Sequence, residues 1–445
     1  MSPKAPHRHS TKKTEDVRLL AARSLIDWLK TGQIEFDKRK SWQYAGDYTL
    51  YKHLVSSAIR HWAKYRFIIE RLTGRTSQKL DREVMASLLL GLAQLEPDSK
   101  IQEHAALNET VELLSRLKKP YLKGFVNANL RRFTRERDRL TAELSAQTID
   151  IQTSHPGEMV QRWQKAFGTQ KALEICQANN ILPDVQVAIN PEFDRKIVLN
   201  GLIEDGFSVS DHFPEGLTIH NPSGLFSSRW MARGAFLVQD IAFQRLNRFL
   251  TPIPKQTVLD TCSAPGGKLI HLEWHFKSDI SSLLGAELKW QRLTRLRENI
   301  RHYRSKASLL MADAMQPPFR NESVDLVLLD VPCSGTGTIR KHPELKWSRT
   351  ISDIQKNHRD QTKMISQSSQ LVKKNGYLFY VTCSLEPEEN EMVIEQFLKT
   401  ADVPFKRVPL ADDRLDPDLF TKAGDYFCFP SSTQMGCFAA LLCRG

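Results

Sequence analysis

The chain has 445 residues, of which 41% are hydrophobic and 26% are charged, and its net charge of +12 makes it strongly basic. This length predicts about three domains, and the composition excludes a disordered chain and a fibrous repeat. No run approaches the roughly 18 apolar residues that a membrane-spanning helix requires, and the start MSPKAPHRHSTKK lacks the apolar stretch of a secretion signal. We therefore expect a cytoplasmic, multidomain protein.

The basic excess lies in the first third of the chain. Residues 1–140 contain 28 Lys and Arg residues against 16 Asp and Glu residues, whereas the rest of the chain contains 35 of each. A basic region attracts the phosphates of nucleic acids independently of their sequence. The alternative is a charge that only keeps the surface soluble, because runs such as Lys38-Arg39-Lys40 also occur on plain solvated faces.

The first region, residues 1–143, shows helical periodicity from about residue 15 onward, which predicts an all-α domain. Its apolar stripes predict core positions and contain no catalytic pattern. They include Leu54, Ile59, Leu88, Leu92, Val111 and Leu114.

Two further regions follow along the chain. Residues 144–232 alternate between helices, such as PGEMVQRWQKAF, and short β-rich pieces, such as DVQVAIN and LTIHN, which predicts a small α+β domain. Residues 233–445 alternate between apolar strands and helices, which predicts an α/β Rossmann-like domain with a parallel sheet covered on both faces.

A glycine-rich turn follows the first strand of this last region. Strand TVLD leads into TCSAPGGK, and the sequence matches neither a Walker loop nor GxGxxG, so a polyphosphate or NAD site is disfavoured. Glu287 and Asp313 end the next two strands at the same sheet edge, where carboxylates can bind ribose hydroxyls and an adenine amino group. The pattern predicts an S-adenosylmethionine site, although both acids could instead cap helices. The loop consists of Cys262, Ser263, Ala264, Pro265, Gly266, Gly267 and Lys268.

Two cysteines follow the fourth and fifth strands, at Asp330-Val331-Pro332-Cys333 and at Thr382-Cys383-Ser384. Carbon 5 of cytosine is too electron-poor to accept a methyl group directly, but a thiolate that adds to C6 makes C5 nucleophilic. Asp330 could stabilise the protonated base, and Lys268 could orient Asp330 or lower a thiol pKa. Burial is the usual fate of a single cysteine at a strand end, but two of them at the ligand edge favour catalysis.

The other cysteines lack this context. Seven cysteines in a long chain, without a C-x-x-C pair, argue against a disulfide framework and against a metal site. We expect the remaining thiols to be buried filler, apart from Cys262, whose backbone belongs to the glycine-rich loop. They are Cys176, Cys428, Cys437 and Cys443.

With SAPGGK, GAELKWQRLTRLREN, DVPCSGTGTIRKHPELKW and YVTCSLEPEENE, the chain resembles the Sun/NOL1/NOP2 family of RNA 5-methylcytosine methyltransferases over nearly its whole length. The N-terminal region resembles a NusB-like RNA-binding domain, and the middle region an RRM-like linker domain. The resemblance implies that Cys383 is the nucleophile and that Cys333 assists product release. It also implies that residues 262–268, Glu287, Asp313 and Asp330 bind S-adenosylmethionine.

The resemblance further implies a cytosine of small-subunit (16S) ribosomal RNA as the target. Because the base must be unstacked to admit a thiol at C6, we expect this cytosine in a loop or a partly folded RNA. Nothing in the sequence demands a dimer, so we expect a monomer. Two alternatives stay open: the same chemistry on tRNA or on another rRNA site, or a noncatalytic RNA-binding or antitermination factor. The chain departs from the family pattern at Ala188-Ile189-Asn190 and at Gly436-Cys437-Phe438. We expect both departures to lie outside the reacting centre.

Overall fold

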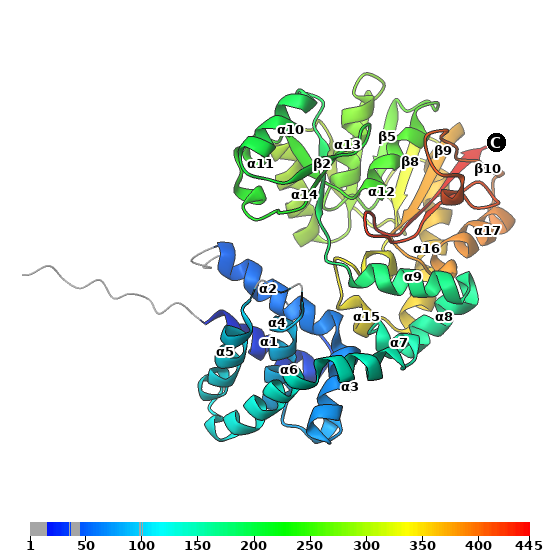
Figure 1. The fold of residues 1–445 in the computed structure, drawn as a ribbon. Helices are drawn as coiled ribbons and strands as arrows, with labels where there is room; N and C mark the ends of the chain where they lie inside the picture. Colours follow the sequence, from blue (N-terminus) through cyan, green and yellow to red (C-terminus); the bar gives the residue numbers. More distant parts are fainter. Residues whose placement is uncertain (1–15, 35, 37–44, 98, 100) are drawn as a thin grey trace, which may run out of the picture. The chain divides into compact units, whose positions relative to one another are not determined.

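The computed structural model describes residues 16–34, 36, 45–97, 99 and 101–445 (Figure 1). The chain divides into two compact units, Met1–Gly157 and Glu158–Gly445. No helix within the described ranges is long and apolar enough to cross a membrane. The basic run Lys38-Arg39-Lys40 and the segment MSPKAPHRHSTKK lie outside the described residues.

The first unit is helical throughout its described ranges, as the sequence predicts. Helix α4 is its central element, because REVMASLLLGLAQ is apolar on every side and is buried from Val84 to Gln94. A Cβ on Gly91 would lie 2.7 Å from the Leu130 side chain, so only glycine permits this approach of α4 to α6. The helices are α1 (Val17–Thr31), α2 (Ala45–Arg60), α3 (Trp62–Thr73), α4 (Arg82–Gln94), α5 (Glu103–Arg116), α6 (Lys123–Ser145) and α7 (Ile149–Gln152), with short turns η1 (Ser77–Lys79) and η2 (Pro120–Leu122).

The apolar stripes of the first unit are core, with one exception. Val111 is only half-buried, because its neighbour Thr110 takes the position on α5 that faces inward. The predicted core positions that are buried are Leu54, Ile59, Leu88, Leu92 and Leu114.

The second unit begins with a small antiparallel sheet of strand order β2-β3-β1-β4. Strand β4 lies beyond residue 232, where the sequence placed the end of the middle domain, yet it pairs with β1 and its Phe236 is buried in the core of the small sheet. The middle fold therefore extends past that expected boundary. Its elements are α8 (Gly157–Phe167), α9 (Thr169–Asn180), β1 (Val185–Ile189), α10 (Arg195–Glu204), β2 (Val209–Asp211), β3 (Leu217–Ile219), η3 (Leu225–Ser227), α11 (Arg229–Ala232) and β4 (Phe236–Val238).

The rest of the second unit is an eight-stranded sheet of order β10-β12-β9-β8-β5-β6-β7, with β11 paired to β12. Figure 1 shows β8 between β5 and β9. The strands are β5 (Thr257–Asp260), β6 (Ser282–Glu287), β7 (Ser308–Met311), β8 (Val324–Asp330), β9 (Val372–Thr382), β10 (Phe405–Val408), β11 (Tyr426–Cys428) and β12 (Cys437–Arg444).

Strands β5 to β9 are parallel, as predicted, but β10, β11 and β12 are antiparallel. The sequence predicts no direction for these C-terminal strands, and their antiparallel pairing makes the sheet a mixed one, as is common among large sheets. The helices and turns are α12 (Ile241–Gln244), η4 (Arg245–Leu250), α13 (Gly267–Phe276), α14 (Trp290–His302), η5 (Thr336–Thr338), α15 (Leu345–Ser348), α16 (Ile351–Leu371), η6 (Pro387–Glu389), α17 (Glu391–Thr400) and η7 (Pro417–Leu419).

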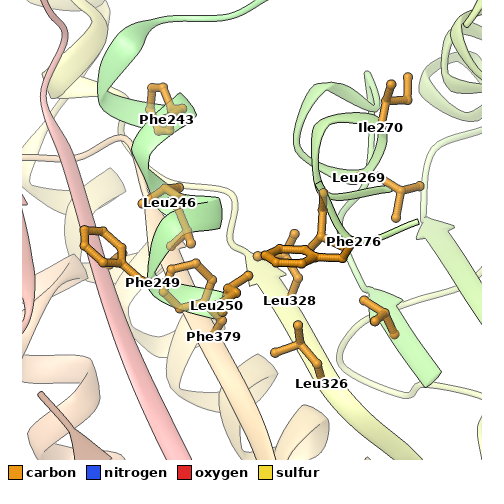
Figure 2. Close-up of a cluster of buried hydrophobic side chains, with 14 of the residues drawn as sticks. Phe243, Leu246, Phe249, Leu250, Leu269, Ile270, Phe276, Leu326, Leu328 and Phe379 are labelled. Atoms are coloured by element: carbon orange, nitrogen blue, oxygen red, sulfur yellow. The ribbon is translucent and has the colours of Figure 1, made fainter. Parts of the chain in front are cut away.

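A hydrophobic cluster fixes α13 against the sheet (Figure 2). Leu269 and Phe276 of α13 are buried, as are Leu326 and Leu328 of β8. Full burial of such a side chain stabilises the fold by about 1.5–3 kcal/mol. Since α13 begins directly after the glycine-rich loop, this packing also fixes the position of that loop.

Candidate active site

The glycine-rich loop connects β5 to α13 and is held by its own backbone and by two side chains of α14, since Arg292 donates to Ala264 O and Asn299 to Pro265 O, each at 2.7 Å. Ser263 N donates to Ala286 O of β6 at 2.9 Å, and Cys262 N donates to Asp260 Oδ1 at 3.2 Å. Gly266 has φ +105, and a Cβ there would lie 2.6 Å from the Leu296 side chain, so the turn requires glycine. A Cβ on Gly267 would meet no heavy atom within 4 Å, which leaves the start of α13 open to a ligand.

Asp260 is a site residue that the sequence analysis did not single out. It is 1% exposed, and burial, followed by the nearby Asp330 carboxylate, raises its pKa to about 7. Its position as the last residue of β5, directly before the glycine-rich loop, was the signal that could have identified it.

Glu287 and Asp313 end or follow the next two strands, as predicted. Glu287 Oε1 accepts a hydrogen bond from Lys289 N at 3.1 Å, and Asp313 Oδ1 accepts one from Met315 N at 2.8 Å. The Glu287 carboxylate also lies 3.4 Å from Arg292 Nε and is almost fully buried. Ala312 N donates to Glu287 O, so both acids lie along one sheet edge.

These residues fit the adenosine part of S-adenosylmethionine. The two carboxylates supply acceptors for hydroxyl and amino groups, and the open start of α13 lets a ligand approach the backbone. No Lys is held in the turn in the manner of a phosphate-binding loop, because Lys268 pairs instead with Asp330.

The Lys268–Asp330 pair connects the glycine-rich loop to the end of β8. Lys268 Nζ donates to Asp330 Oδ2 at 2.6 Å and lies 4.5 Å from the centre of the Phe243 ring. Burial alone would lower the pKa of Lys268, but the Asp330 carboxylate raises it above its usual value. Lys268 therefore stays cationic and fixes Asp330 at the end of β8.

Cys333 and Cys383 meet at the same edge, at the ends of neighbouring parallel strands. The two sulfur atoms are 3.2 Å apart, although 50 residues separate them in the sequence. The strand register explains the meeting, since Asp330 of β8 lies opposite Val381 of β9. Gly337 N also donates to Cys383 O at 2.9 Å, which joins the two loops.

The two thiols are not equivalent. The hydrogen bond from Cys333 lowers the pKa of Cys383 below its usual value, against the opposing effect of burial. The same hydrogen bond, with burial, raises the pKa of Cys333. Cys383 is therefore the thiol that ionises more readily, and Cys333 is the proton donor that stabilises its thiolate.

A buried carboxylate that the sequence analysis missed, Glu389, ties the two cysteine loops together. Its side chain accepts hydrogen bonds from Ser334 N at 2.8 Å, from Ser334 Oγ, and from Asn357 Nδ2 at 2.8 Å. Ser334 Oγ also lies 3.1 Å from Ser384 Oγ. Ser334 and Ser384, which follow the two cysteines, are thus joined by a hydrogen bond.

A second missed contact anchors the loop that follows Cys383. Arg162 of α8 donates to Glu386 at 2.8 Å and to Glu388 at 2.8 Å, and Trp163 Nε1 donates to Glu386 at 3.1 Å. Glu386 is 2% exposed. Because 224 residues separate Arg162 from Glu386, no local pattern could have indicated this contact.

The remaining predicted positions have different outcomes. Burial raises the pKa of Cys262, which keeps its thiol neutral. The expectation that Gly436 lies outside the reacting centre was wrong, because Gly436 N donates to Gly337 O at 2.8 Å, within the loop that contains Cys333. Asn190 of the other departure donates to Gly234 O at 3.0 Å, between β1 and β4. The described residues contain no group of three or more side chains arranged to hold a metal ion.

The fold and the site define a class of protein. A Rossmann-like sheet with a glycine-rich turn after its first strand and acids after the second and third is that of an S-adenosylmethionine-dependent methyltransferase. Three family models match in chain order: the NusB family over residues 15–135, the Methyltr_RsmF/B-like ferredoxin-like domain over residues 155–225, and 16S rRNA methyltransferase RsmB/F over residues 247–442.

Relatives agree with these matches. Proteins named ribosomal RNA small subunit methyltransferase B from Salmonella arizonae and Salmonella dublin are each 33% identical over 398 residues, which cover 87% of this chain and 91% of the relative. The chain therefore belongs to the 16S rRNA methyltransferase family RsmB/F, and S-adenosylmethionine is its cofactor, as the sequence predicts.

Solved structures share the fold. The crystal structure of PH0851 covers 97% of this chain and 100% of its own, with a TM-score of 0.74 at 24% identity. The crystal structure of NSun6 from Pyrococcus horikoshii with SFG covers 65% of this chain and 98% of its own, with a TM-score of 0.56 at 19% identity.

Proposed function

We propose that this rRNA methyltransferase transfers a methyl group to C5 of a cytosine through a covalent adduct between Cys383 and C6. The observation that carries the proposal is the 3.2 Å contact between Cys383 and Cys333 at the ends of neighbouring strands, where the pKa of Cys383 is lowered. A single buried thiol would have no reason to be ionised. A thiolate stabilised by a second thiol fits nucleophilic attack on a pyrimidine.

The electron balance of the reaction assigns a role to each group. The Cys383 thiolate forms a bond to C6, and the electrons of the C5=C6 double bond become available at C5, which accepts the methyl group. S-adenosylmethionine, when bound, supplies that methyl group in electrophilic form. A base then removes the C5 proton, the S–C6 bond breaks, and the C5=C6 double bond forms again. Cys333 assists this release.

Asp330 and Lys268 act on the substrate base and on each other. Asp330 hydrogen-bonds the N3/N4 edge of cytosine and stabilises the positive charge on the base while the thiolate attacks. Lys268 holds that carboxylate in position through its 2.6 Å hydrogen bond. Residues 262–268, Glu287, Asp313 and Asp330 form the cofactor site in this proposal.

The substrate is a cytosine of small-subunit rRNA in an accessible loop or a partly folded RNA, since attack at C6 requires an unstacked base. The enzyme acts as a cytoplasmic monomer of three parts: the helical N-terminal domain, a middle domain that extends past residue 232 to include β4, and the C-terminal methyltransferase domain. The family matches, and the relatives that align over 87% of this chain, support small-subunit rRNA as the substrate.

Two single substitutions test the covalent chemistry. Cys383→Ala should abolish methyl transfer from S-adenosylmethionine to RNA, because no adduct can form. Cys333→Ala should accumulate a covalent RNA–protein adduct on a denaturing gel, because release is impaired. Cys443→Ala is the matched control and should turn over normally, since Cys443 pairs with Tyr377 at the end of β9 remote from Cys383. If the Cys383 variant formed an adduct and the Cys333 variant formed none, Cys333 would be the nucleophile and Cys383 would assist release.

The target is tested separately, by bisulfite sequencing of total RNA from cells with and without the gene. The proposal is supported if one cytosine of 16S rRNA resists bisulfite conversion in cells with the gene and loses this resistance in cells without it. Loss of a protected cytosine in tRNA or at another rRNA site would keep the chemistry but replace the substrate. No change at any cytosine would overturn C5 methylation.

A further inference from the structure

Helix α14 and the turns on either side of it concentrate positive charge on the catalytic unit. Residues 288–306 contain seven Lys and Arg residues and one acidic residue, Glu298. The even balance of charge over the last two thirds of the chain conceals this cluster. It is offset by residues 384–425, which contain eleven acidic residues and five basic ones.

All but one of the cations of this segment are unpaired. Within the part of the chain that the structure describes, six of them have no acidic side chain within ion-pair distance, whereas Arg292 pairs with Glu287. All six side chains are exposed, so they carry charge that no protein group neutralises. They are Lys289, Arg295, Arg297, Arg301, Arg304 and Lys306.

An exposed aromatic ring belongs to the same surface. Trp290 is 58% exposed, and the Arg297 guanidinium lies 5.4 Å from the centre of its ring. Residues 290, 297 and 301 are seven and four positions apart, which places them on one side of the helix. This side presents a flat ring next to two unpaired guanidinium groups.

A cavity lies at the C-terminal end of the helix. It has a volume of about 460 Å³, and its lining includes Arg233, His302 and Arg304. The acid in its lining, Glu192, is already paired with Lys277 at 3.0 Å. The positive surface of α14 thus continues into a hollow with an excess of cationic side chains.

We propose that this surface, which we call the α14 surface (Trp290, Arg297, Arg301 and Arg304), binds a single-stranded segment of the RNA substrate. Its guanidinium groups contact phosphates, and Trp290 stacks on a base. The inference rests on the proposed function only in taking RNA as the substrate. It gives the catalytic unit an RNA-binding surface of its own, in addition to the basic surface of the helical unit.

The chemistry of the surface favours RNA over a protein partner. Arginine groups that contact phosphates release counterions and bind a polyanion without regard to sequence. Aromatic rings and guanidinium planes are the groups on which unpaired RNA bases stack. An acidic protein would use the cations as well, but it would gain little from an exposed ring beside them.

The opposite edge of the sheet provides a matched control. Strand β7, next to α14, is one edge, and β10, which follows α17, is the other. Lys399 of α17 and Lys406 of β10 are exposed and have no ion-pair partner among the described residues. Replacing both with Gln removes the same two charges as Arg297→Gln with Arg301→Gln.

The experiment measures binding of the full-length protein to an unmodified 16S rRNA transcript at several salt concentrations. Arg297→Gln with Arg301→Gln should weaken binding about tenfold and reduce the slope of log K against log salt by about 1.4, since each lost phosphate contact on a single strand contributes about 0.7. Trp290→Ala should weaken binding with little change in this slope. Trp290→Phe should retain most of the affinity of the natural protein.

The outcomes distinguish the surface from the chemistry. An unchanged affinity and slope in the double arginine variant, or an equal loss in the Lys399 and Lys406 control, would overturn the surface while leaving methylation intact. Normal RNA binding through α14 together with no C5 methylation would overturn the proposed function and leave the surface. Unchanged S-adenosylmethionine affinity in the arginine variant verifies that the neighbouring cofactor site is undisturbed.

Discussion

The carboxyl edge of the large sheet has two halves that are held in different ways. The cofactor half comprises the ends of β5, β6 and β7, and the reactive half comprises the ends of β8 and β9. In the cofactor half, Asp260, Glu287 and Asp313 each accept a hydrogen bond from the N–H two residues later. In the reactive half, the contacts of Cys333 and Ser334 reach residues 50 and 55 positions away.

This difference predicts which substitutions should displace neighbouring loops and which should affect only the substituted residue. A strand end that is ordered by its own turn can lose a side chain without moving its neighbours. Loops that are ordered by each other must shift together when one contact is removed, because a partly satisfied buried polar network is costly. Substitutions in the two halves should therefore separate cofactor affinity from turnover.

Among the residues that hold the two halves in place, the largest effect is expected for Glu389→Ala, in the reactive half. Losing the acceptor of the two Ser334 bonds and the Asn357 bond should displace Cys333 from Cys383 and lower kcat about 100-fold, the cost of a misplacement near 1 Å. Equilibrium binding of S-adenosylmethionine should stay unchanged. Glu395→Ala on the exposed side of α17 is the control and should leave kcat unchanged. If Glu389→Ala weakened S-adenosylmethionine binding as much as it lowered kcat, the two halves would not be independent.

The next effect is expected for Glu287→Gln, in the cofactor half. Replacing a charged acceptor by a neutral one should weaken S-adenosylmethionine binding about tenfold, the usual range for a hydrogen bond to a charged group. At saturating cofactor the kcat should recover. Calorimetric titration and steady-state kinetics measure the two quantities, and a kcat that stays low at saturation would contradict a purely local role.

A smaller effect is expected at the sulfur pair itself. Cys333→Ala removes the hydrogen bond that lowers the pKa of Cys383, so this pKa should rise. Alkylation of Cys383 by iodoacetamide below that pKa should slow about tenfold for each unit of the rise. Peptide mapping at pH 7 to 10 follows Cys383 alone. An unchanged pH profile would mean that Cys333 does not stabilise the thiolate.

The smallest effect is expected for Asp260→Asn, where the two halves meet. Burial raises the pKa of Asp260 to about 7, so the folded state holds a proton that the unfolded state has released above its ordinary pKa. Stability contributed by this group therefore falls as the pH rises from about 4 to 7. Between pH 6 and pH 7 the loss should be about 1 kcal/mol.

Urea unfolding of both proteins at these two pH values measures that difference. The side-chain amide oxygen introduced by D260N can still accept from Cys262 N, so the turn should persist in this variant. Its stability should change less over the interval than that of the natural protein, because the amide does not titrate. A parallel pH dependence in both proteins would show that Asp260 is ionised in the folded state.

The same contrast explains how much of the molecule the sequence could predict. Apolar strands, a glycine-rich turn and acids at strand ends are local signals, so the parallel core and the positions of Glu287 and Asp313 followed from patterns. The meeting of Cys333 and Cys383 followed from placing two strand ends at one sheet edge.

The features that were missed depend on contacts between distant segments. Glu389 reaches Ser334 from 55 residues away and Arg162 reaches Glu386 from 224 residues away, and neither spacing has a recognisable pattern. Strand β4 is only three residues long, and its assignment to the small sheet depends on pairing with β1. The contact of Gly436 with Gly337 likewise arises only when β12 returns beside β9.

The central claim, that Cys383 attacks C6 of a cytosine, is tested most directly with RNA that contains 5-fluorocytidine. After attack and methyl transfer, C5 carries fluorine in place of the proton that must leave, so the adduct persists. Mass spectrometry of the digested complex should find the methylated nucleotide on the peptide that contains Cys383. A nucleotide on Cys333, or methyl transfer to RNA without any covalent adduct, would contradict the account.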